Sequence, residues 1–205
     1  DLKVAWIWKS PDHELVQSIG KTINPPLSAN AMKATPLVVN GVMYISTALG
    51  QIAALDPATG ATRWVHNPEA YKDGGPANIT GPWQTRGLAY WSDGRTDERL
   101  LMGTLDGYLL ALDAKTGKPI PAFGVNGKAD LYAAVPRATR RTLHLYSGEA
   151  QYISSNSPPV IVRDTVVVGY SESDRPTFKS WPPGYVQAFD VKTGKLKWVF
   201  HVIPQ

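Results

Sequence analysis

Hydrophobic and polar residues alternate along this chain in short runs, which is the pattern typical of half-buried β-strands. Turn residues such as Asn40-Gly41 and Asp93-Gly94 separate the runs. Asn-Gly between two apolar runs strongly indicates a hairpin, because both central residues of the favoured turn need positive φ. The generous content of Gly and Pro, 18 and 17 residues, also favours many turns. We therefore expect an all-β chain built from antiparallel hairpins.

One turn motif, Ala-apolar-Asp-x-x-Thr-Gly, occurs in residues 54–60, 111–117 and 188–194. The Asp carboxylate can accept backbone N–H groups across the turn, and Gly can adopt the left-handed conformation that closes it. Each copy therefore predicts a β-hairpin. An accidental hairpin explains one copy well and three copies poorly.

A large aromatic residue follows the motif. Trp64 and Trp198 stand at the same distance after the Gly in the first and third copies, whereas the second copy has Pro121 there and Phe123 close by. Large aromatic rings contribute strongly to packing when buried. We expect Trp64 and Trp198 to lie buried between adjacent sheets.

Another pair of strand patterns precedes each hairpin, so that each repeat contains four antiparallel strands. Such repeats are the blades of a β-propeller. We predict a single partial β-propeller domain over residues 1–205, with a strand of a closing blade at 1–9 and three blades at 33–68, 84–124 and 157–202. Because propellers use about four to eight blades, we expect the chain to be an N-terminal part of a longer protein.

Composition excludes several classes of function. The net charge of +4 comes from scattered Lys and Arg, so no nucleic-acid partner is expected. The absence of Cys excludes disulfides, Cys-ligated zinc and covalent c-type haem from this segment. The sequence contains no apolar run of roughly 18 residues, so this segment is expected to contain no membrane span.

The repeat with its following Trp resembles the tryptophan-docking motif of the pyrroloquinoline quinone (PQQ) dependent dehydrogenases. Residues 33–44, 86–91 and 157–169 are similar to marked segments of that family. The resemblance implies an eight-bladed propeller that holds PQQ and a calcium ion near its axis. It also implies a periplasmic enzyme, attached to the inner membrane if at all by parts outside this chain. Such an enzyme oxidises an alcohol, polyol or sugar and passes electrons to a cytochrome or quinone.

The same resemblance implies site residues. Its cofactor contacts are Arg86, Asn156, Ser171, Glu172 and Ser173, and its metal ligand is Asp174, with Glu172 as the rival ligand. Asn156 stands where the family has a hydroxyl residue. The catalytic Asp of the family is expected beyond this chain, so no catalytic residue is assigned within it.

Two departures distinguish the chain from alcohol-oxidising members. Residues 32–34 contain no acid where those members carry a PQQ-contacting Glu, and Thr80-Gly81 stands in place of a vicinal disulfide. The sequence is thus closer to the sugar, polyol and uncharacterised branches. The alternative is a non-catalytic scaffold resembling the outer-membrane protein assembly lipoprotein, which has similar blades and no cofactor. Residues 86–91 and the turn at Asp174 favour the enzyme.

Overall fold

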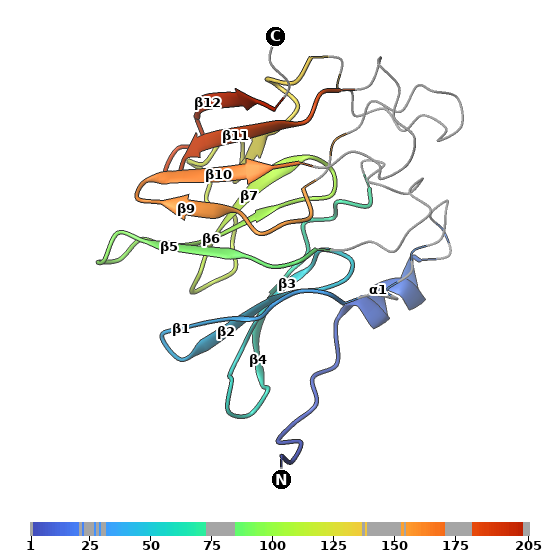
Figure 1. The fold of residues 1–205 in the computed structure, drawn as a ribbon. Helices are drawn as coiled ribbons and strands as arrows, with labels where there is room; N and C mark the ends of the chain where they lie inside the picture. The colour runs from blue at the N-terminus through green and yellow to red at the C-terminus, as the bar shows by residue number, and fades with distance from the viewer. Residues whose placement is uncertain are drawn as a thin grey trace.

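Three four-stranded antiparallel sheets follow one another along the chain, preceded by the short helix α1 (Asp12–Ser18) (Figure 1). The computed structural model describes residues 2–20, 22, 27, 29, 32–72, 85–136, 138, 153, 155–170 and 182–202. Each sheet pairs its strands in chain order. The prediction of an all-β propeller with four-stranded antiparallel blades is confirmed.

The strands of the three sheets have the following bounds. The first sheet contains β1 (Leu37–Val39), β2 (Val42–Ser46), β3 (Ile52–Leu55) and β4 (Thr62–His66). The second contains β5 (Ala89–Ser92), β6 (Glu98–Gly103), β7 (Tyr108–Asp113) and β8 (Lys128–Asp130). The third contains β9 (Val160–Val162), β10 (Thr165–Gly169), β11 (Tyr185–Asp190) and β12 (Leu196–His201).

The second sheet ends later than the predicted boundary at residue 124, because its fourth strand is β8. Pro119 and Pro121 follow β7 and have no N–H to donate to a strand ladder. An isolated bridge joins Leu112 to Pro119, but residues 114–127 form no strand. The fourth strand therefore begins after the prolines.

Residues 1–9 were predicted to form a strand of a closing blade, but residues 2–9 form no strand. A strand needs a hydrogen-bonding neighbour, and no described strand pairs with this segment. Two indole hydrogen bonds attach it instead to the first sheet. Trp6 Nε1 donates to Pro57 O at 3.1 Å, and Trp8 Nε1 donates to Thr62 Oγ1 at 3.0 Å.

The repeated motif forms the predicted turn in all three copies. The Asp carboxylates accept the backbone N–H groups of Thr59, Thr116 and Thr193 at 3.0, 2.7 and 2.9 Å. The closing glycines have φ values of 72°, 70° and 68° at Gly60, Gly117 and Gly194. Asp accepts across the turn and Gly supplies positive φ, as the motif indicates.

An aromatic ring from an earlier part of the chain lies against each of the same three glycines. A Cβ built on Gly60 would lie 2.6 Å from the Trp6 ring, and one on Gly117 would lie 2.5 Å from the Trp64 ring. A Cβ on Gly194 would lie 3.2 Å from the ring of Phe123. Gly117 and Gly194 therefore leave the space in which a ring of one sheet packs on the next, whereas Gly60 takes a ring from residues 2–9, which form no strand.

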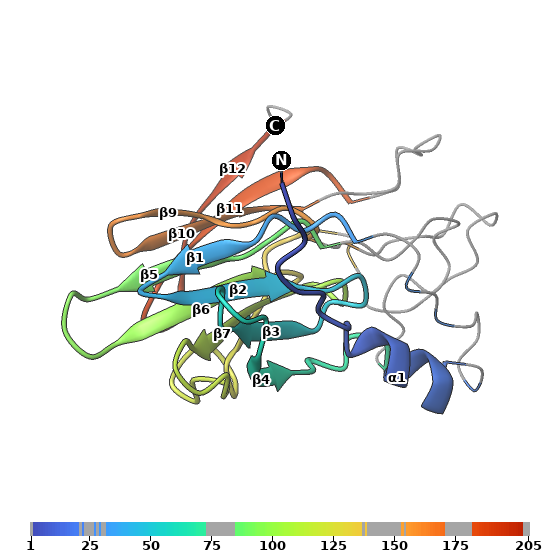
Figure 2. The same cartoon turned by 90° about the horizontal axis from the view of Figure 1, so that it is seen from below.

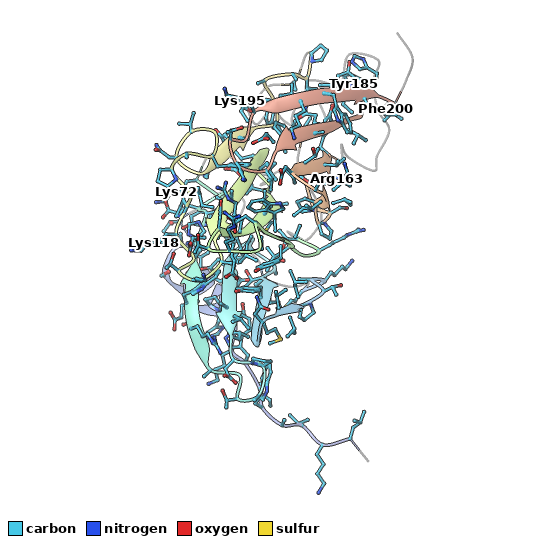
Figure 3. The ribbon with its side chains drawn as sticks, turned by 90° about the vertical axis from the view of Figure 1, so that its left-hand side faces the viewer. Lys72, Lys118, Arg163, Tyr185, Lys195 and Phe200 are labelled. Atoms are coloured by element: carbon cyan, nitrogen blue, oxygen red, sulfur yellow. The ribbon has the colours of Figure 1, made fainter. Side chains whose placement is uncertain are left out.

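The two repeat tryptophans differ in burial. Trp64 is half-buried against the core between the first two sheets, whereas 46% of Trp198 is exposed. The prediction that both are buried is therefore wrong for Trp198. Trp198 lies on β12, whose face no further described sheet covers, and Phe200 on the same strand is also exposed (Figure 3).

Arg99 joins the second sheet to the third. Its guanidinium is buried and forms two 2.7 Å hydrogen bonds with the carboxylate of Asp97. The remaining nitrogen donates to Val191 O at 3.1 Å and Lys192 O at 2.8 Å. A bidentate pair with a carboxylate fixes the plane of the guanidinium. Arg99 of the second sheet therefore binds the β11–β12 turn of the third sheet through hydrogen bonds.

The raised pKa of Tyr90, which is hydrogen-bonded to Glu98, predicts that the protein loses stability at alkaline pH. Burial first, and then the 2.7 Å hydrogen bond to Glu98, raise the pKa of Tyr90 to about 12. The pKa of Tyr in an unfolded chain is about 10. Between about pH 10 and 12 the phenol is therefore protonated in the folded protein and ionised in the unfolded chain. The stabilisation is complete below about pH 10 and is lost as pH rises through that range. Unfolding free energies of wild type and Tyr90→Phe, measured from pH 8 to 11, should converge as pH rises, and parallel curves would contradict this.

Candidate functional site

β5 and β9, the first strands of the second and third sheets, are in contact, and β1 is the corresponding strand of the first sheet (Figure 1). In each sheet the fourth strand forms the opposite edge. The segments that lead into these strands are hydrogen-bonded to each other. Arg86 N donates to Asn156 O at 2.8 Å, and Thr35 N donates to Arg86 O at 3.1 Å. Two of the predicted site residues are therefore direct neighbours, although seventy positions separate them in the chain.

Gly87 lets these segments approach closely. It is buried and has a φ of +147°. A Cβ built there would lie 3.4 Å from Thr35 O and 3.5 Å from Pro158 Cγ. Positive φ and crowding on both sides are conditions that glycine meets more easily than any other residue. Gly87 thus allows the close approach of the segments that positions the backbone of Arg86.

The side chains of Arg86 and Asn156 have free hydrogen-bonding capacity within the described part of the chain. Arg86 is exposed, and its guanidinium bonds to no described residue. Asn156 Oδ1 is buried and has no hydrogen-bond partner among the described residues. An unsatisfied buried acceptor costs about 1–3 kcal/mol, so a donor or a cation at Asn156 would stabilise the site.

Hydroxyl residues directly before the two site residues hold the backbone in place. Thr85 Oγ1 donates to Thr47 O at 2.9 Å, and Ser155 Oγ donates to Gly169 O at 3.0 Å. Both residues are buried. Thr85 and Ser155 were not identified from the sequence as supporting residues. A hydroxyl residue directly before both Arg86 and Asn156 is the pattern that could have indicated them.

The remaining predicted site residues, Ser171, Glu172, Ser173 and Asp174, lie outside the described residues. The strand that precedes them, β10, ends at Gly169, which accepts the hydrogen bond of Ser155. Within the described ranges no three His, Asp or Glu side chains come together as metal ligands. In those same ranges no helix has the length and apolar character needed to cross a membrane.

The arrangement suits a flat anionic ligand. A guanidinium remains charged at all ordinary pH values and presents a planar fork of donors to carboxylates. The carboxamide of Asn156 adds a second polar contact on the adjoining segment, and its oxygen is of the hard type that calcium prefers. The donor set therefore fits the rim of a polycarboxylate ring with a nearby cation.

Comparison with known proteins shows the family to which the chain belongs. The family model of the PQQ-dependent glucose/ethanol/alcohol dehydrogenase β-propeller domain matches residues 1–205. Quinoprotein glucose dehydrogenase A of Acinetobacter calcoaceticus is 31% identical over 217 residues, covering 98% of this chain and 24% of that protein. The dehydrogenase subunit of the quinone-dependent alcohol dehydrogenase of Acetobacter aceti is 35% identical over 182 residues, covering 84% and 20%. The chain spans about a quarter or less of these relatives.

Solved structures give the same result. Quinohemoprotein alcohol dehydrogenase ADHIIG of Pseudomonas putida HK5 superposes with a TM-score of 0.61 at 29% identity, over 86% of this chain and 21% of that one. A europium-containing methanol dehydrogenase superposes with a TM-score of 0.57 at 26% identity, over 85% and 26%. By sequence over its whole length and by fold, this chain belongs to the β-propeller domain family of the PQQ-dependent glucose, ethanol and alcohol dehydrogenases.

Proposed function

We propose that the protein containing this chain is a periplasmic PQQ-dependent dehydrogenase that oxidises an alcohol, polyol or sugar and passes the electrons to a cytochrome or quinone. In this proposal the chain contributes one wall of the cofactor site. The observation that carries it is the 2.8 Å hydrogen bond from Arg86 N to Asn156 O, which places two implied cofactor contacts side by side. Family membership supports the reaction class.

Arg86 and Asn156 would hold the rim of PQQ. The cofactor is a planar tricarboxylate, and a guanidinium pairs with a carboxylate through two parallel hydrogen bonds. Asn156 would donate to the same rim through its carboxamide NH₂ group, which leaves its buried oxygen, without a partner among the described residues, for a donor or a cation. When bound, PQQ supplies the quinone that accepts a hydride from the substrate carbon.

The metal ligand proposed from the resemblance is Asp174, with Glu172 as the rival, and calcium is the metal proposed. Calcium takes oxygen ligands from carboxylates and amide carbonyls, and Asn156 Oδ1 is such an oxygen, on a residue whose backbone is hydrogen-bonded to that of Arg86. One relative in the comparison is a europium-containing methanol dehydrogenase. Metal-free protein should therefore be reconstituted separately with calcium and with a lanthanide.

Replacing Arg86 with Ala in the full-length protein is expected to weaken PQQ binding about tenfold to a hundredfold. The reason is the loss of one charge-assisted contact, which is worth about 1.5–3 kcal/mol. The measurement is a titration of the apo-protein with PQQ in the presence of the metal, followed by absorbance. Arg95→Ala is the matched control, since Arg95 is an exposed arginine on the β5–β6 turn at the other end of the sheet.

Two outcomes would contradict these assignments. If wild type binds no PQQ with either metal, the non-catalytic scaffold becomes the better hypothesis. If wild type binds PQQ and Arg86→Ala binds it equally well, the reaction class stands but Arg86 is not a cofactor contact.

A further inference from the structure

A buried carboxylate attaches α1 to the first sheet. Asp12 is 2% exposed and accepts hydrogen bonds from Thr47 Oγ1 at 2.6 Å, Gln51 Nε2 at 2.9 Å and Leu49 N at 3.0 Å. All three donors belong to the connection between β2 and β3, and both views of the ribbon place α1 beside it (Figures 1 and 2). Burial of a carboxylate is unfavourable unless donors satisfy it, and here three donors do so.

The hydrogen bonds continue from this carboxylate to the candidate site. Thr47, whose hydroxyl donates to Asp12, accepts the hydroxyl of Thr85 on its carbonyl at 2.9 Å. Thr85 is buried and directly precedes Arg86, whose N–H donates to Asn156 O. This chain of hydrogen bonds runs from Asp12 on α1 through Thr47 to Thr85, which is bonded covalently to Arg86.

The second sheet shows that Asp12 is not needed to form this kind of turn. Thr104 occupies the place of Thr47, and its hydroxyl accepts Tyr108 N at 3.0 Å as that of Thr47 accepts Gln51 N at 3.0 Å. The hydroxyl of Thr104 donates to Tyr108 O rather than to a carboxylate among the described residues. Although Asp106 within this turn is buried, the hydroxyl of Thr104 needs no carboxylate acceptor for the turn to form, so the role of Asp12 lies beyond the turn itself.

We propose that Asp12 is a positioning residue for Arg86, acting through Thr47 and Thr85. This inference rests on the proposed function of Arg86 as a PQQ contact. A fixed Thr47 carbonyl holds the Thr85 hydroxyl, and the peptide between Thr85 and Arg86 is thereby ordered before the ligand arrives. Preorganisation raises affinity because less freedom is lost on binding.

Asp12→Asn in the full-length protein tests the proposal. Asn keeps the shape but brings an N–H₂ group against donors, so at least one of the three hydrogen bonds is lost. We expect faster hydrogen exchange of the Arg86 amide in the apo-protein, together with a PQQ dissociation constant raised roughly 3- to 30-fold. Glu14→Gln removes the same charge from an exposed position of the same helix and should behave as wild type.

The double variant with Arg86→Ala separates positioning from general destabilisation. If Asp12 acts through Arg86, Asp12→Asn should not weaken PQQ binding further when Arg86 is absent. An equal loss in both backgrounds overturns the proposal, as does unchanged exchange of the Arg86 amide. If wild type binds no PQQ, the proposed function fails, but amide exchange still decides whether Asp12 orders this backbone. Should Asp12→Asn not fold, Thr85→Val removes the next hydrogen bond and is expected to give the same two effects.

Discussion

Replacing Phe123 with Ala is expected to lower the free energy of unfolding by about 3–5 kcal/mol, the usual cost of emptying a buried aromatic site. Phe123 is 0% exposed and belongs to the core between the second and third sheets. Its ring lies against Gly194, and the next residue, Gly124, donates its N–H to Thr193 O at 2.9 Å. The variant would leave a cavity where two sheets join. Denaturant unfolding of the full-length apo-protein measures the loss.

Val125 provides the control for this prediction. It lies two positions further along the same loop and is 75% exposed, so Val125→Ala should change the unfolding free energy by no more than about 0.5 kcal/mol. If the two variants lose similar amounts of stability, Phe123 does not join the sheets.

Phe123 also shows what the sequence could predict and what it could not. The hairpin turns follow from a local pattern, in which Asp accepts N–H groups and Gly supplies positive φ, and all three form as predicted. The place of the aromatic ring does not follow from local pattern. In the second copy two prolines delay the fourth strand, and Phe123 reaches Gly194 from a loop. That contact depends on a glycine in the next repeat.

Trp64 and Trp198 also show that burial of the ring does not follow from the local pattern. They occupy equivalent positions in the motif, yet Trp64 packs over Gly117 and Trp198 is 46% exposed. In these two copies the ring stands on the fourth strand of its sheet. Whether the ring is buried depends on the sheet that packs against that strand.

The residues proposed for the candidate site come from resemblance alone, and the groups that support them were not found from the sequence. Arg86 and Asn156 were assigned by resemblance, and the hydrogen bond between their backbones is a tertiary contact that spacing cannot reveal. Nothing in the sequence distinguishes Asp12, which follows Pro11, from the other acidic residues. Its burial depends on how α1 docks against the β2–β3 connection, which no periodicity in a seven-residue helix could have indicated.

Replacing Gly117 with Ala is expected to destabilise the protein by about 2–5 kcal/mol, for two separate reasons. The residue has a φ of 70°, a conformation that costs a residue with a Cβ about 1–2 kcal/mol. The new Cβ would also lie 2.5 Å from the ring of Trp64, and such overpacking costs about 1–3 kcal/mol. Denaturant unfolding of the full-length apo-protein again gives the measurement.

Gly94→Ala separates these two contributions. Gly94 has a φ of 75° and no atom within 4 Å of the position that a Cβ would take, so only the backbone term of about 1–2 kcal/mol applies. The excess loss in Gly117→Ala measures the packing of the Trp64 ring over the next sheet. Adding Trp64→Ala to Gly117→Ala should remove that excess, since the clash then disappears. Equal losses in the two glycine variants would show that Trp64 does not press on Gly117, and the ring would then not be what joins the first sheet to the second.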